Sequence, residues 1–147
     1  MTASQNNESV PLNLVGENES PRSETIDETS IRRLVELFYT RIQQDQMLGP
    51  IFGSIVTDWD MHFEKMTRFW SSAVLKAGTY SGRPLEAHRF GGLTKAHFDR
   101  WVQLFSQTAH DVFSHADAEI FVNLGKKMAI NIAMRIGTGK LDYSLSS

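Results

Sequence analysis

The sequence contains no cysteine, only four prolines and no long uninterrupted apolar run. The lack of cysteine excludes disulfides, thiolate metal sites and cofactors tethered through a thioether. Without an apolar run of about 20 residues we expect no membrane-spanning helix. No run of Lys and Arg exceeds a pair and the formal net charge is −2. The charge pattern therefore gives no support to nucleic acid or a membrane surface as a partner.

The N-terminal segment also lacks aromatic residues. Residues 1–25 contain no Phe, Trp or Tyr and are rich in Ser, Asn and Glu. Such a segment buries too little surface to offset the entropy of ordering the chain. We therefore predict a disordered polar tail over residues 1–25 and a single folded domain over residues 26–147. The N-terminus lacks the basic start and apolar stretch of a signal peptide, so we expect a cytoplasmic protein.

The remaining sequence shows helical periodicity and no strand-like alternation. Apolar residues recur at helical spacing in four segments, of residues 28–44, 58–77, 94–112 and 116–137. We expect residues 28–30 to cap the first helix, and residues 48–52 to form a turn and a short apolar connector. A short helix should begin at Pro84 and end at Gly91-Gly92. The pattern predicts an all-α fold.

His62 is the most informative residue of the second predicted helix. It lies within an apolar stripe that includes Trp59, Phe63 and Met66. A histidine in such a position is most often a core residue with one hydrogen bond. However, Tyr39 and Trp101 lie on the apolar faces of two other predicted helices, and each brings a polar hydrogen into a dry region. Three donors without a nearby carboxylate or thiolate suit a bound diatomic ligand better than a zinc or iron–carboxylate site.

His88 ends the phrase Gly82-Arg83-Pro84-Leu85-Glu86-Ala87-His88. At the end of a one-turn helix, its Nδ1–H can donate to the carbonyl of Pro84, which leaves Nε2 available as a metal ligand. Leu85 shares its face and can pack on a flat cofactor. The alternative is a loop histidine with no role.

Several phrases, taken in order, resemble the truncated haemoglobins, and among them the third group. The phrases span roughly residues 28–137 and need no large insertion: Phe38-Tyr39, Asp45 with Leu48–Phe52, Trp59–His62 with Phe69-Trp70, Tyr80–His88, and Phe98 with Trp101. Each phrase is modest alone, whereas the ordered set is specific.

The resemblance implies a two-over-two helical sandwich around a non-covalently held b-type haem. His88 would be the proximal ligand of the haem iron. Tyr39, His62 and Trp101 would be the polar residues on the distal side. The residues expected to line the haem are Phe52, Met66, Phe69, Leu85 and Phe98. The other histidines, His97, His110 and His115, match no ligand position and are expected at the surface or at helix ends, with His97 as the fallback ligand.

Such a protein would bind O2, NO and CO. Three donors would hold O2 too firmly for simple delivery, so we expect chemistry on the ligand, either conversion of NO to nitrate or activation of peroxide, supported by an unidentified reductase. The alternatives are a non-catalytic carrier or sensor and a haem-free helical interaction module. His62 could also bind the iron itself when no gas is present.

Overall fold

The structure is a computed structural model that describes residues 22–75 and 93–145. Within them it contains five helices, α1 (Glu28–Gln44), α2 (Gly49–Ile55), α3 (Trp59–Leu75), α5 (Lys95–Val112) and α6 (His115–Arg135). The predicted all-α fold is confirmed. The short helix predicted at Pro84 lies outside the described residues, and so do Leu85 and His88.

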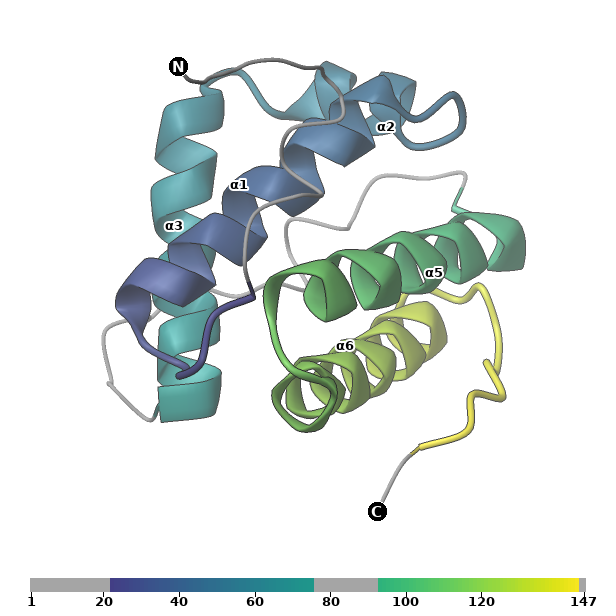
Figure 1. Ribbon diagram of the computed structural model, residues 1–147. Helices are drawn as coiled ribbons and strands as arrows, with labels where there is room; N and C mark the ends of the chain where they lie inside the picture. The colour runs from purple at the N-terminus through teal and green to yellow at the C-terminus, as the bar shows by residue number, and fades with distance from the viewer. Residues whose placement is uncertain (1–21, 76–92, 146–147) are drawn as a thin grey trace.

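The helices are arranged as two packed pairs. Helix α1 crosses α3 to form one pair, and α5 lies along α6 to form the other (Figure 1). Contacts between α1 and α5 join the pairs, and the short α2 packs on α1. Each long helix therefore buries one face against its partner.

Helix α1 begins with a reciprocal cap. The carboxylate of Asp27 accepts from the backbone N–H of Ser30 at 2.8 Å, and the Ser30 hydroxyl accepts from the backbone N–H of Asp27 at 2.9 Å. The two bonds satisfy donors that a helix start leaves without partners. The cap is thus Asp27, one residue before the predicted Glu28–Ser30. The predicted apolar face is fully buried, at Ile31, Leu34, Val35, Phe38 and Ile42.

The expectation of a turn and connector over residues 48–52 was wrong, because this segment begins helix α2. Pro50 occupies the first turn, where a helix needs no backbone N–H. The carboxylate of Asp45 accepts from the backbone N–H groups of Met47 and Leu48 at 3.1 and 3.0 Å. These bonds stabilise the tight entry into a helix of seven residues.

The other helices begin close to their predicted positions. The Asp58 carboxylate accepts from the backbone N–H of Met61 at 3.1 Å and so caps α3 as predicted. Thr94 precedes α5, also as predicted. Helix α6 begins at His115, one residue before the predicted start, because the Ser114 side chain caps it.

The core is divided into two clusters. The larger cluster lies among α1, α2, α3, α5 and the start of α6, and its fully buried members include Phe38, Phe105, Phe113 and Phe121. The smaller cluster lies between the start of α5, the end of α6 and the C-terminal segment, with Phe98, Ala129, Ile132, Ala133 and Leu141. No helix within the described residues is long and apolar enough to cross a membrane.

The segment before α1 runs along the turn between α5 and α6. The backbone N–H of Ser23 donates to the carbonyl of Val112 at 2.7 Å, and the Arg22 guanidinium donates to the carbonyl of His110 at 2.6 Å. These two residues belong to the end of the segment predicted as a tail. Residues 1–21 of that segment lie outside the described residues.

Candidate functional site

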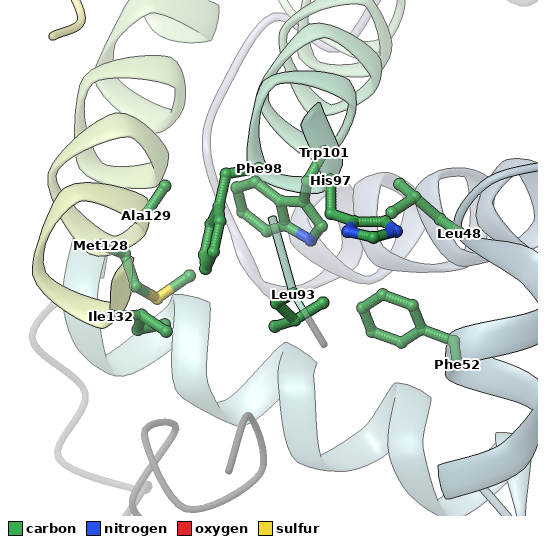
Figure 2. A pocket seen from close by; sticks show the side chains of 9 residues that line it. All are labelled: Leu48, Phe52, Leu93, His97, Phe98, Trp101, Met128, Ala129 and Ile132. Carbon is green, nitrogen blue, oxygen red and sulfur yellow. The ribbon is translucent and has the colours of Figure 1, made fainter. Parts of the chain in front are cut away.

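An apolar cavity lies where the two core clusters meet. Its volume is about 30 Å³, room for a few water-sized molecules, so the side chains that line it lie close together. Figure 2 shows the side chains contributed by α6 on one side of the cavity and those contributed by α2 on the other. The residues that line it are Leu48, Phe52, Leu93, His97, Phe98, Trp101, Met128, Ala129 and Ile132. The walls therefore suit a flat apolar group that would bridge the two clusters.

Three predicted site residues line this cavity together. Phe52 comes from α2, and Phe98 and Trp101 come from successive turns on the same side of α5. Residues three apart on a helix lie on the same face, which explains how α5 presents both rings to one space. The sequence resemblance thus identified residues that the fold brings together from distant parts of the chain.

Tyr39 and His62 lie next to each other, and Tyr39 lies beside Phe52, which lines the cavity. Their rings meet edge to face with centroids 4.6 Å apart, and Tyr39 is only 4% exposed. The centroids of Tyr39 and Phe52 are 6.1 Å apart, so the Tyr39–His62 pair adjoins the cavity through Phe52. The His62 ring also meets Trp59 edge to face, at 5.7 Å, and its Nε2 is buried. The two predicted donors from α1 and α3 therefore form one cluster.

The ring of Phe38 contacts both Trp101 and Tyr39. Phe38 meets Tyr39 at 4.9 Å and Trp101 at 5.3 Å, both edge to face. Trp101 is also stacked on Phe105, with centroids 5.1 Å apart and planes inclined by 13°. Contacts on two sides fix the indole in the cavity wall. Tyr39 and His62 are thus in direct contact, and Trp101 contacts Phe38, which in turn contacts Tyr39.

An ion pair between a buried carboxylate and a partly exposed guanidinium joins two walls of the cavity. The Asp45 carboxylate lies 2.6 Å from Nη2 and 2.7 Å from Nε of Arg100. Burial acts to raise the pKa of Asp45, but hydrogen bonds from the Arg100 guanidinium and from the backbone of Leu48 and Met47 outweigh it and lower the pKa below its ordinary value of 3.8. Asp45 therefore remains charged and fixes α2, which carries Phe52, against α5.

His97, the fallback ligand, lies in the cavity wall. Its Nδ1 accepts from the backbone N–H of Thr94 at 2.9 Å, as part of the cap of α5. In the neutral imidazole, the hydrogen must then be on Nε2, because an accepting nitrogen carries none. A metal ligand needs a lone pair at the coordinating nitrogen. In this arrangement His97 offers the cavity a donor and not a ligand.

Two other predicted residues do not line the cavity. Met66 and Phe69 are half-buried on α3 and pack against the larger cluster, where Phe69 meets Trp70 with centroids 5.1 Å apart. His88 and Leu85 lie outside the described residues.

Sequence reasoning did not identify the side of the cavity formed by α6. Met128, Ala129 and Ile132 contribute to it. A signal was present, since Met128 and Ile132 belong to the apolar stripe of this helix. The stripe alone could not distinguish a cavity wall from closed core.

Comparisons with known proteins identify the family and agree with the overall fold. The sequence profile of a family described as bacterial-like globin matches residues 25–134. The chain is 30% identical over 111 residues to the group 3 truncated haemoglobin ctb of Campylobacter jejuni, covering 72% of this chain and 87% of that protein. It is similar to the crystal structure of a group III truncated haemoglobin from Campylobacter jejuni, with a TM-score of 0.73 and 29% identity over 79% of this chain and 95% of that one.

Proposed function

Because this chain belongs to the bacterial-like globin family, we propose that it holds a b-type haem in the cavity between its core clusters and binds diatomic gases there. When bound, the haem supplies an iron atom that can take up O2, NO or CO. The observation that supports this function best is the cavity itself. Its lining is apolar except for the imidazole of His97 and the indole N–H of Trp101.

Some residues of the chain would bind the cofactor, and others would bind the gas ligand. Phe52, Phe98 and Met128 would pack on the porphyrin faces or edges. His88 is the proposed iron ligand, on the basis of its place in the family motif. The cap hydrogen bond to Nδ1 of His97 supports this choice, because it disfavours His97 as the competing ligand.

Tyr39, His62 and Trp101 would donate hydrogen bonds to the gas ligand. Their rings are held by aromatic neighbours, so little entropy would be lost when they engage it. A hydrogen bond to a partly charged acceptor contributes about 1.5–3 kcal/mol. That is roughly a 10- to 150-fold gain in affinity, expressed mainly as slower release.

Slow release favours chemistry on the ligand over delivery. We infer that the protein converts NO to nitrate, with O2 as the oxidant and a reductase supplying the one further electron, or activates peroxide. Tyr39 and Trp101 would polarise the reacting oxygen atoms. Turnover distinguishes this activity from a carrier or sensor. Catalytic consumption of NO or peroxide with a supplied reductant supports the enzyme, whereas uptake that stops at one equivalent supports the carrier.

The test is the rate of O2 release from the haem-loaded protein, measured by stopped flow. We expect Tyr39→Phe to speed release by about tenfold or more, because it removes one donor. Tyr143→Phe is the matched control. The Tyr143 hydroxyl donates to Asp99 at 2.6 Å, and Tyr143 packs on the smaller cluster. An unchanged rate in Tyr39→Phe, or an equal change in both variants, would contradict the role of Tyr39.

His62 needs its own test, because it can act as a donor or as a second iron ligand. The family resemblance favours the donor role. The absorption spectrum of the ferric protein distinguishes the two roles. Low-spin bands that survive His62→Leu exclude His62 as the sixth ligand, and their loss in this variant would assign it that position.

A further inference from the structure

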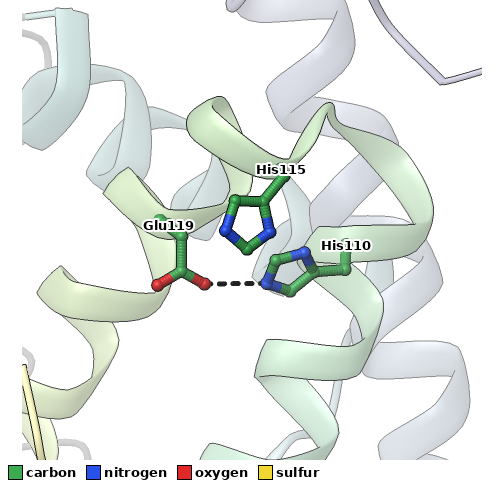
Figure 3. Close-up of side chains that lie close together, drawn as sticks. All are labelled: His110, His115 and Glu119. Atoms are coloured by element: carbon green, nitrogen blue, oxygen red, sulfur yellow. Dashed lines mark hydrogen bonds and ion pairs between the residues drawn. The ribbon is translucent and has the colours of Figure 1, made fainter. Parts of the chain in front are cut away.

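A second group of metal-ligating side chains lies at the turn between α5 and α6. His110 belongs to the last turn of α5, His115 is the first residue of α6, and Glu119 follows one turn later. One candidate ligand atom from each residue lies within 4.8 Å of the other two. Nε2 of His110 is 2.8 Å from a carboxylate oxygen of Glu119, and the two imidazole centroids are 5.1 Å apart (Figure 3).

We propose that His110, His115 and Glu119 bind a divalent transition-metal ion, with Zn2+ as the best match. Two imidazole nitrogens and one carboxylate oxygen are ligands that Zn2+ prefers, and three protein ligands leave a fourth position for water. Zinc–ligand bonds of about 2.0–2.2 Å in a tetrahedron place ligand atoms about 3.3 Å apart. The His110–Glu119 pair, at 2.8 Å, would open by about 0.5 Å to reach that spacing, and the His115 nitrogen, within 4.8 Å of both, would move closer.

The backbone around the turn holds the three residues in place. His115 and Glu119 are four apart on α6, the spacing that puts two ligands on one helix face. Phe113 is fully buried in the turn and stacks on Phe121, with centroids 4.8 Å apart. Ser114 caps α6 by accepting from the backbone N–H of Asp117. The backbone at the start of α6 is therefore well ordered by packing and capping, while the ligand side chains remain partly exposed.

The local chemistry suits exchange of a proton for a metal ion. Nε2 of His110 and the Glu119 carboxylate are in hydrogen-bond contact, and a cation between them would replace the shared hydrogen. The Arg22 side chain also reaches this turn, where its Nε donates to the backbone carbonyl of His110. That contact engages the backbone of His110 and not its imidazole. The side chains of His110 and Glu119 are 31% and 24% exposed, so an ion can enter from solvent.

This site is separate from the cavity. His97 lines the cavity at the start of α5, and His110 lies 13 residues further along the same helix. At 1.5 Å per residue the two are about 20 Å apart. A bound ion would crosslink the end of α5 to the start of α6 and stabilise the larger core cluster, whatever the cavity holds.

The test is calorimetric titration of the full chain with Zn2+. We expect saturable binding that weakens by at least about tenfold in His110→Ala, His115→Ala and Glu119→Gln, since changing even an outer-shell partner costs 10- to 100-fold. Glu64→Gln is the matched control for Glu119→Gln. Glu64 is an exposed α3 residue paired with Arg68, and this variant should bind Zn2+ like the parent.

A second measurement, of thermal unfolding, tests Zn2+ binding also in variants whose fold is less stable than that of the parent chain. In the parent chain, Zn2+ should raise the midpoint of thermal unfolding, and the increase should be absent from all three ligand variants. Binding should also weaken as pH falls, because protons compete for the ligands. The proposal is overturned if no saturable binding occurs, if the ligand variants bind like the parent, or if Glu64→Gln loses as much affinity as Glu119→Gln.

Discussion

The guanidinium of Arg100 binds the carboxylate of Asp45 through two nitrogens. Nε and Nη2 lie 2.7 and 2.6 Å from the same oxygen, Oδ1. The same carboxylate accepts from the backbone N–H groups of Met47 and Leu48, the two residues directly before α2. One side chain therefore sets the start of the short helix that carries Phe52 and ties it to the helix that carries Trp101. The shape of the cavity depends on this link.

We expect Asp45→Asn to lower the free energy of unfolding by about 1.5–3 kcal/mol, because it removes hydrogen bonds to a charged acceptor whose side chain is only 6% exposed. Urea denaturation measures this difference. The control is Glu36→Gln, which breaks the exposed pair between Arg32 and Glu36 on α1. An exposed pair of this spacing contributes about 0.3–0.5 kcal/mol. Equal losses in both variants would contradict the role given to Asp45.

The stability of the fold should decrease in acid. The pKa of Asp99 is lowered by the Lys95 ammonium and the Tyr143 hydroxyl, and that of Asp45 is lowered chiefly by Arg100 against the opposing effect of burial. A carboxylate whose pKa is lower in the folded state contributes stability above its unfolded pKa of about 3.8. That contribution is lost as pH falls through the folded value.

Urea denaturation between about pH 5 and about pH 2 therefore should show a falling free energy of unfolding. The decline should be shallower in Asp45→Asn, which has one such carboxylate fewer. A free energy that rises in this range, or an equal slope in the variant, would show that Asp45 does not carry this dependence.

Gly125 allows close contact between α6 and the aromatic stack of α5. A Cβ at this position would lie 3.0 Å from Cδ2 and 3.1 Å from Cε2 of Phe105. Phe105 is 2% exposed and stacks on both Trp101 and Trp70, so its ring has little room to move. We expect Gly125→Ala to destabilise the fold by about 1–3 kcal/mol through overpacking, despite the helix propensity of alanine.

The comparison is Gly53→Ala, since a Cβ on this α2 glycine meets nothing within 4 Å. That variant should gain up to about 1 kcal/mol from helix propensity. The thermal unfolding midpoints of both variants measure the contrast. If the Gly125→Ala variant were more stable than the parent chain, the aromatic rings packed around Phe105 would have to move aside more easily than their packing indicates.

Filling the cavity should impair haem uptake. Ala129 is 3% exposed and lines the cavity from α6. Ala129→Leu places a larger side chain there, and we expect the affinity for haemin to fall by about tenfold or more, with helix content retained in the circular dichroism spectrum. Met134→Leu, on the same helix but 58% exposed, should bind haemin like the parent. Unchanged affinity in Ala129→Leu would place the cofactor elsewhere.

The sequence predicted most helices because local signals determined them. The apolar spacing of α1 and the Asp58 cap of α3 are short-range features that periodicity reveals. The prediction for residues 48–52 failed because a helix of seven residues is too short to show a period, and its start depends on Asp45, which in turn is held by Arg100. Tertiary contacts decided that element.

The same distinction applies to the candidate site. The ordered phrases of the family resemblance placed Phe52, Phe98 and Trp101 in one site, and the structure brings these three together. The contribution of α6 was missed because an apolar stripe with Met128 and Ile132 looks the same in sequence whether it lines a cavity or closed core, and Ala129 has no chemical signal. The role of His97 could not be predicted from the sequence either, because it depends on a hydrogen bond at the cap of α5.

Haemin titration of the parent chain and of His88→Ala, followed through the Soret band, tests directly whether His88 holds the haem iron. The parent chain should take up haemin saturably. His88→Ala should bind haem weakly, with a shifted Soret band, because the proposed iron ligand is gone. A variant that keeps its full complement of haem and an unaltered Soret band would contradict the central claim.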